Sequence, residues 1–122
     1  MSRQRHGLGR WGESLAVRLL QKKGYRIVQR NWRSARGEID LIVEKDDEWV
    51  FVEVKTRRGR AMGTPEEALT ESKARQLMSL ALEYVASEGL DVDWRIDLVA
   101  VELDRRGRIV RCEHIPNAVL GW

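Results

Sequence analysis

Two acids and a lysine in neighbouring segments are the residues of this sequence best suited to chemistry. Asp40 lies in one apolar segment, and Glu53 and Lys55 lie in the next, after the polar stretch Lys45-Asp46-Asp47-Glu48. If that stretch folds the two segments into an antiparallel hairpin, the three side chains can converge. Two carboxylates about 4 Å apart repel by about 4 kcal/mol at an effective dielectric constant of about 20, so a neutralising cation is expected. A divalent metal with oxygen ligands and a lysine beside it is typical of phosphodiester hydrolysis, which predicts a Mg²⁺ or Mn²⁺ site.

The pattern around Asp40 predicts a β-strand. Alternation places Ile39, Leu41 and Val43 on one face and Glu38 with Asp40 on the other. Glu38 is therefore expected beside the metal ligands or bound to one of the arginines in the loop before it. The alternative for the acids is a pair of surface carboxylates matched with arginines, and for the lysine a cross-strand salt bridge worth less than about 1 kcal/mol.

A helix expected over residues 9–23 carries a third acid. Glu13 shares a helical face with Ala16, Val17 and Leu20, at offsets of three, four and seven residues. A charged residue on an apolar face is costly unless it is paired or bound to a metal, so we expect Glu13 to join the other acids as a metal ligand. The alternative is a carboxylate that the helix dipole stabilises near the helix N-terminus.

Basic residues are distributed unevenly along the chain. The 122 residues contain 22 Lys and Arg against 19 Asp and Glu, a net charge of +3, but residues 1–36 contain ten Lys and Arg and a single acid. A basic flank beside an acidic pocket suits a polyanion such as DNA. We expect phosphate contacts from Arg33, Arg36, Arg57, Arg58, Arg60 and Lys73. For Lys73 the sequence favours the alternative, a lysine at the edge of a helix with its ammonium group in water.

The elements that must position these residues follow from periodicity and from helix-start and turn signals. Residues 1–8 are expected as a flexible basic tail. Thr64, Pro65 and Glu67 predict the start of a second helix, with Thr64 as N-cap, which continues to about residue 87. Strands are expected at 25–32, 37–43, 50–55, 94–102 and 108–115. The order αβββαββ predicts a mixed α/β sheet flanked by the two helices.

Length and composition predict one domain over residues 1–122. A single cysteine, Cys112, excludes an intramolecular disulfide, and no apolar run has the length of a signal peptide core or a membrane span. We therefore expect a cytoplasmic protein that does not enter a membrane. Whether it acts alone or as a homodimer is left open by the sequence.

These residues resemble the PD-(D/E)XK nuclease superfamily, and more specifically the YraN-like family of small bacterial proteins. The resemblance covers nearly the whole chain. It includes Gly12-Glu13 with Ala16, Gly24-Tyr25, Asn31-Trp32-Arg33, Gly37-Glu38-Ile39-Asp40-Leu41-Ile42, Phe51-Val52-Glu53-Val54-Lys55-Thr56-Arg57, Lys73, Arg95-Ile96-Asp97 and His114-Ile115-Pro116-Asn117-Ala118.

The resemblance implies a restriction-endonuclease-like fold, similar to archaeal Holliday-junction resolvases. Glu13, Asp40, Glu53 and Lys55 fall where the superfamily places its helix glutamate, metal aspartate, second acid and lysine, and Ile39 stands at the position of its name-giving proline, which varies. We therefore expect a Mg²⁺- or Mn²⁺-dependent nuclease acting on DNA, with branched or repair intermediates among its substrates. Two rivals remain: a nucleic-acid-binding module without turnover, and an interaction protein whose basic surface docks an acidic partner.

Overall fold

The structure, a computed structural model, describes residues 2–119, with side chains from residue 8 onward. Its elements are α1 (Ser2–Lys22), β1 (Arg26–Ser34), β2 (Gly37–Lys45), β3 (Glu48–Arg58), the short 3₁₀ turn η1 (Glu66–Ala68), α2 (Glu71–Glu88), β4 (Trp94–Leu103) and β5 (Ile109–Val119). This mixed α/β arrangement confirms the predicted order αβββαββ.

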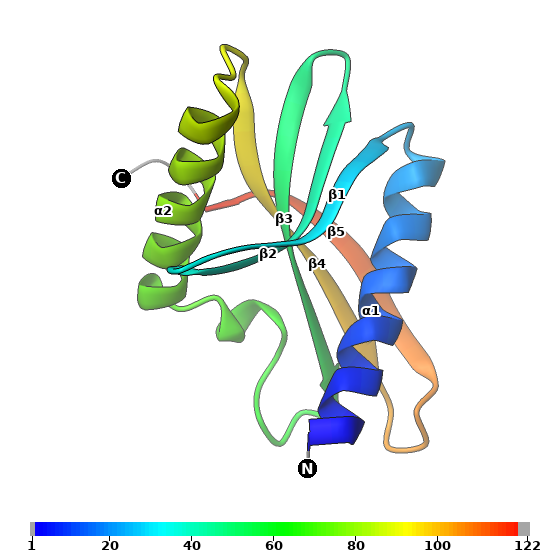
Figure 1. Cartoon of the computed structure of the whole chain (residues 1–122). Coiled ribbons are helices and arrows are strands. Elements are labelled where there is room, and N and C mark those ends of the chain that lie inside the picture. Colours follow the sequence, from blue (N-terminus) through cyan, green and yellow to red (C-terminus); the bar gives the residue numbers. More distant parts are fainter. Residues whose placement is uncertain (1, 120–122) are drawn as a thin grey trace.

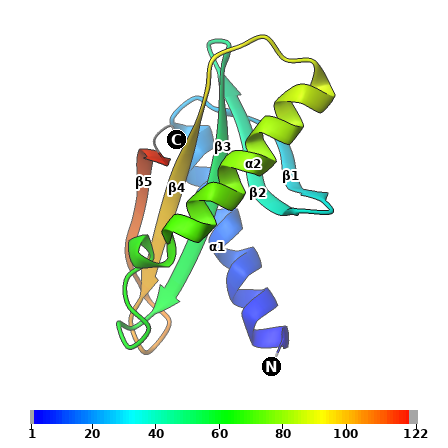
Figure 2. The ribbon, with the colours of Figure 1, turned by 90° about the vertical axis from the view of Figure 1, so that its left-hand side faces the viewer.

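The five strands form one mixed sheet between two helices. The strands lie in the order β1-β2-β3-β4-β5, and only β3 and β4 pair in parallel. Helix α1 covers one face of the sheet and α2 covers the other, as the two views at right angles show (Figures 1 and 2). Helix α2 connects β3 to β4, as expected for the crossover between two parallel strands.

Two apolar clusters, one on each face, hold the helices to the sheet. On one face, Ala16 and Leu20 of α1 are fully buried against Leu41 and Val52. The cluster on the other face contains Ile42, Phe51, Leu77, Leu80, Ile96 and Tyr84. The ring of Tyr84 meets those of Trp32 and Phe51 edge-on, at 5.4 and 5.6 Å between centroids. Trp32 is therefore a packing residue of this cluster.

The polar stretch between β2 and β3 forms the expected hairpin. Asp46 and Asp47 both have left-handed backbone conformations, with φ of 51° and 64°. A two-residue turn with positive φ at both positions matches the twist of paired strands, and aspartate tolerates this region better than most residues. Lys45 and Glu48 pair on either side of the turn.

Strands β1 and β2 bend together near the centre of the sheet. Arg30 pairs with Leu41 and Trp32 with Ile39, so Asn31 lies opposite Asp40, and Asn31 has a φ of 54°. Beyond this bend the hairpin reaches across to α2 (Figure 1). The bend also interrupts the alternation of side chains.

The predicted common face of Ile39, Leu41 and Val43 is consequently wrong. Ile39 is buried in the cluster under α2, whereas Leu41 and Val43 are buried in the cluster under α1. Regular alternation requires an unbroken extended backbone, and the left-handed residue in the paired strand marks the place where it fails.

The starts of both helices differ from the predictions. Helix α1 begins at Ser2, so residues 2–8 are its first turns and not a tail; arginine and glutamine are good helix formers, and the charge of the arginines does not end the helix. Met1 lies outside the described residues.

Thr64 and Glu67 make the two reciprocal hydrogen bonds of a capping box, but the helix they begin is only η1. Helix α2 starts at Glu71, after Thr70 in extended conformation, whose hydroxyl accepts a hydrogen bond from the Lys73 N–H.

Candidate active site

Asp40 and Glu53 meet where β2 and β3 separate. The last backbone pair between these strands is Leu41 with Val52. One residue beyond it, the Asp40 Oδ2 atom accepts a hydrogen bond of 2.8 Å from the Val54 N–H, taking the place of a strand carbonyl. The carboxyl groups of Asp40 and Glu53 lie within hydrogen-bonding reach of each other. The separation of the strands therefore leaves two acids side by side at an opening in the sheet.

The electrostatics of this pair favour a bound proton. Burial, followed by the negative charge of Glu53, raises the pKa of Asp40 from its ordinary 3.8 to about 8. The hydrogen bond from Val54 opposes this rise, while the charges of Glu13 and Glu38 add smaller increments. The other three acids named in the sequence analysis are therefore close enough to act on Asp40. Near neutral pH the pair therefore holds a proton, and a divalent cation would neutralise the two carboxyl groups more completely.

Glu13 reaches the acidic cluster because α1 lies unusually close to β3. A Cβ atom on Gly12 would stand 2.1 Å from Thr56 Oγ1, so only glycine permits this approach. The Glu13 carboxylate accepts hydrogen bonds of 3.1 and 3.2 Å from the Asn31 amide and lies 3.9 Å from the Arg30 guanidinium. The left-handed Asn31 thus links the bend in β1 to the helix. Glu13 as a metal ligand stays a prediction.

Two lysines approach the acids from the other side. Burial raises the pKa of Glu53, and the nearby positive charge of Lys73 opposes this rise, as does the charge of Lys55 to a smaller extent. The Lys73 Nζ atom lies 3.5 Å from Glu53 Oε2. Both lysines and Glu53 line a cleft of about 160 Å³, which Pro65, Ala68, Leu69 and Leu98 complete.

The donor set fits a magnesium or manganese ion. Asp40 and Glu53 supply carboxylate oxygens, which hard divalent cations prefer. In an extended strand the N–H and C=O groups of one residue point to the same side, so the Val54 carbonyl faces the gap into which its N–H donates to Asp40. Among the residues whose side chains are described, no three Asp, Glu, His or Cys groups are arranged to hold a metal ion by themselves. Backbone and water oxygens would have to complete the coordination.

The arginines expected to contact phosphate fall into distinct environments. Arg33 is mostly exposed and bonds Glu38 at 3.3 Å, and Arg36 is exposed at the β1–β2 turn. Arg58 is exposed at the end of β3, whereas the buried Nε atom of Arg57 has no hydrogen-bond partner among the described residues. Their contacts with nucleic acid stay predictions.

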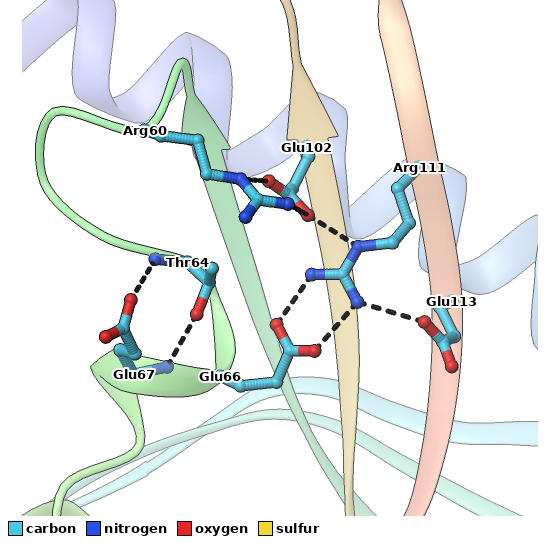
Figure 3. Close-up of polar contacts among 7 residues, drawn as sticks. All are labelled: Arg60, Thr64, Glu66, Glu67, Glu102, Arg111 and Glu113. Atoms are coloured by element: carbon cyan, nitrogen blue, oxygen red, sulfur yellow. Dashed lines mark hydrogen bonds and ion pairs between the residues drawn. The ribbon is translucent and has the colours of Figure 1, made fainter.

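Arg60 departs from the expectation of an arginine available in a basic loop. Residues 59–70, here called the strap, run from β3 to α2 and include the Pro65, Ala68 and Leu69 side chains that line the cleft. Arg60 donates to both oxygens of Glu102 at 2.8 and 3.2 Å (Figure 3). Its charge is thereby committed to β4, because Glu102 is a buried carboxylate that requires a partner.

Arg111 of β5 ties the other half of the strap to the sheet. It donates to Glu102 at 2.6 Å and forms two bonds with Glu66 of η1 at 2.6 and 2.8 Å (Figure 3). Burial alone would raise the pKa of Glu102, but the bonds from Arg60 and Arg111 outweigh it and hold this pKa below its ordinary value. This group of Arg60, Glu66, Glu102 and Arg111, here called the strap network, fixes the wall of the cleft. Nothing in the sequence indicated that these four residues would meet.

A second buried carboxylate has a structural role. Asp97 is fully buried and accepts hydrogen bonds from Arg95, from the Asn117 N–H and from His114 Nε2, the last at 2.6 Å. Arg95 and Asp97 also form an ion pair, with the Arg95 Nε atom 2.9 Å from Asp97 Oδ1. His114 belongs to this network because the irregular pairing of β4 and β5 brings it to Asp97.

The fold and the site together define a mixed α/β protein with a carboxylate–lysine cleft at the separation of two strands. Residues 12–101 match the uncharacterised protein family UPF0102, and the chain belongs to this family. This confirms the predicted YraN-like membership. No helix among residues 2–119 has the length and apolar character to cross a membrane.

Relatives of this family match nearly the full chain. A UPF0102 protein of Roseiflexus castenholzii is 46% identical over 121 residues, covering 98% of each chain. One from Syntrophomonas wolfei is 54% identical over 114 residues, covering 91% of this chain and 96% of its own. One from Flavobacterium psychrophilum is 39% identical, covering 94% and 95%.

Proposed function

We propose that this protein is a metal-dependent nuclease of the PD-(D/E)XK superfamily that hydrolyses phosphodiester bonds in DNA in the cytoplasm. The observation that carries the proposal is the pair of mutually repelling carboxyl groups, Asp40 and Glu53, the second of which lines one cleft with two lysines. Such an arrangement costs stability in the folded protein, and groups with strongly shifted pKa values gather at functional sites.

Each residue has a definite part in this proposal. Asp40, Glu53 and the Val54 carbonyl hold the cation, and Glu13 adds negative charge from α1. A bound Mg²⁺ or Mn²⁺ supplies a nucleophile at neutral pH and neutralises charge on the phosphate. Lys55 places a positive charge at the phosphate as negative charge develops there. Arg33 and Arg36, on the hairpin that bends toward α2, hold the flanking backbone of the DNA.

The proposal is tested by metal binding and cleavage together. Titration with Mn²⁺ is expected to show a site that Asp40→Asn abolishes, while Glu88→Gln, at the far end of α2, leaves it intact. Cleavage is then measured on single-stranded, duplex and branched DNA with Mg²⁺ or Mn²⁺. Wild-type protein that binds DNA but cuts none of these substrates would instead be a nucleic-acid-binding module. Equal Mn²⁺ binding by wild type and Asp40→Asn would remove the metal site from the proposal.

A further inference from the structure

Lys73 occupies a position that the helix itself disfavours. It lies in the first turn of α2, where its backbone N–H is bonded to the N-cap Thr70. The positive end of the helix dipole lies at this terminus, so a lysine there is unfavourable by a few tenths of a kcal/mol to about 1 kcal/mol. A residue that opposes the local preference of its helix needs a compensating contact, and the structure shows one.

That contact is with Glu53. The Lys73 Nζ atom is 3.5 Å from Glu53 Oε2, and the two side chains are 34% and 12% exposed. The sequence favoured a lysine at the edge of the helix with its ammonium group in water. The structure corrects this: the side chain turns inward to the cleft and contributes charge to the candidate metal site.

A divalent metal ion on the two acids would increase the positive charge in and beside the cleft. Asp40 and Glu53 can carry two negative charges, and Lys55 and Lys73 carry two positive charges. A divalent cation on the two acids would bring two further positive charges close to Lys73 and occupy the oxygens that now hold it. The ammonium group and the metal ion therefore compete for Glu53.

The cleft indicates where the released ammonium group would go. Its volume of about 160 Å³ is well below the roughly 300–1,000 Å³ of sites that enclose whole ligands. A phosphate group fits such a space, while the sugar and base attached to it must remain outside. With a metal ion in place, the surplus positive charge of the cleft favours that phosphate.

We propose that Lys73 holds Glu53 before metal binds and transfers its ammonium group to the DNA phosphate once a metal ion occupies Asp40 and Glu53. This inference rests on the proposed function. Lys73 is thus a positioning residue for Glu53 in the metal-free protein and a phosphate contact in the loaded one. The exchange would couple metal binding to DNA binding, because the metal ion releases the Lys73 side chain that the DNA phosphate then binds.

The test uses Lys73→Met, Lys73→Arg and the matched control Arg75→Met, which removes one positive charge from the same helix two residues later. Mn²⁺ affinity is measured by calorimetry without DNA. We expect Lys73→Met to bind Mn²⁺ about tenfold more tightly, because the competing charge is gone. Lys73→Arg and Arg75→Met should stay close to wild type. Melting temperatures of all four proteins establish that each is folded.

A second measurement follows the phosphate. A phosphorothioate oligonucleotide, which resists cleavage, is titrated with Mn²⁺ present, and Lys73→Met is expected to bind it several-fold more weakly than Arg75→Met. Unchanged or weaker Mn²⁺ binding by Lys73→Met overturns the inference, and so does unchanged oligonucleotide binding by this variant. Wild-type protein that binds no Mn²⁺ overturns the proposed function as well, so the two failures are distinguishable.

Discussion

The Asp40–Glu53 pair and the strap network place carboxylates on neighbouring strands of one sheet, yet they treat negative charge in opposite ways. Glu102 receives three hydrogen bonds from Arg60 and Arg111, and its pKa lies below the ordinary value. Asp40 faces another acid, and burial together with that charge raises its pKa to about 8. Both carboxylates are removed from water, so the difference lies in their partners.

Under the proposed function, the contrast separates charges that hold the fold together from charges that bind a ligand. A buried carboxylate with arginines on both oxygens is complete, and adding a cation to it would gain little. A buried carboxyl pair that retains a proton is incomplete, because a divalent cation satisfies both acids better than one proton does. Mutations in the two regions should therefore affect different measurements.

The largest expected effect is on cleavage, from a change at the pair. Glu53→Gln and Lys55→Ala should each lower the rate by about 10²–10³, because each removes positioned charge at the scissile phosphate. Their unfolding free energies should change by less than about 1 kcal/mol, since the Glu53–Lys73 contact is partly exposed. Rates and denaturant unfolding are compared with Lys22→Ala, at the far end of α1. Full cleavage by both variants would point to another site or to a contaminating nuclease.

The second effect is a pH dependence of metal binding at the pair. Because a proton must leave before Mn²⁺ binds, affinity should rise about tenfold per pH unit toward pH 8 and then level off, as the pKa of Asp40 is about 8. Calorimetric titrations from pH 6 to 9 measure this. A flat profile below pH 8 would contradict the shared proton.

The free energy of unfolding without metal should depend on pH in opposite directions for the carboxyl groups with raised and with lowered pKa. The pKa of Asp40 is raised in the fold, so its contribution is greatest below pH 4 and is lost as the pH rises toward 8. The pKa values of Asp97 and Glu102 are lowered, so their contributions are present at neutral pH and are lost on acidification. Metal-free wild-type protein should therefore lose stability between pH 5 and 8 in thermal unfolding experiments, and Asp40→Asn should not show this loss.

Much of this fold could be predicted from the sequence because the signals are local. Alternating apolar residues defined β3, and two adjacent aspartates between two strands predicted the turn that the structure forms. The acids of the site were found because Asp40 and Glu53 lie on adjacent strands with only a short turn between them. A separation of thirteen residues is still within the reach of hairpin reasoning.

The features that the sequence missed depend on tertiary geometry. The side chain of Ile39 lies on the opposite face of the sheet from the predicted one, because Asn31 in the neighbouring strand adopts a left-handed conformation opposite Asp40. Arg60 and Glu102 are 42 residues apart, and their contact requires the parallel pairing of β3 with β4. The pattern of its helix alone would place the Lys73 side chain in solvent, because its partner Glu53 belongs to a different element, β3. Asn31 and Gly12 offered only one signal in the sequence, their residue types. Asparagine tolerates a left-handed backbone, and glycine permits a close contact.

The third effect is on stability, from a change in the strap network. Glu102→Gln should lower the unfolding free energy by about 2 kcal/mol, because Arg111 and Arg60 lose the charged acceptor between them. Mn²⁺ affinity should remain within a factor of about 2 of wild type, since none of the proposed metal ligands belongs to the strap network. Chemical denaturation and calorimetry on the same preparation check both halves. Loss of metal binding without loss of stability would mean that the two regions are not separate.

The smallest effect is on the salt dependence of DNA binding by arginine variants. It shows whether structural and ligand-binding charges can be separated among the arginines as well as among the acids. Arg33 and Arg36 are exposed on the β1–β2 hairpin, whereas Arg60 is bound to Glu102 by two hydrogen bonds. Each phosphate contact that is lost lowers the slope of log affinity against log salt by about 0.9 for duplex DNA. Arg33→Gln and Arg36→Gln should therefore each reduce this slope by about that amount and weaken binding only a few-fold at low salt.

Arg60→Gln is the informative control for this measurement. Because its guanidinium already neutralises a buried carboxylate, its replacement should leave the salt slope unchanged and lower the melting temperature instead. Anisotropy titrations of labelled duplex DNA at several salt concentrations, paired with thermal unfolding, measure both quantities. A reduced slope for Arg60→Gln with unchanged stability would show that this arginine leaves Glu102 to bind phosphate. The strap network would then be part of the DNA-binding surface, and the separation between structural and functional charge would fail at the strap.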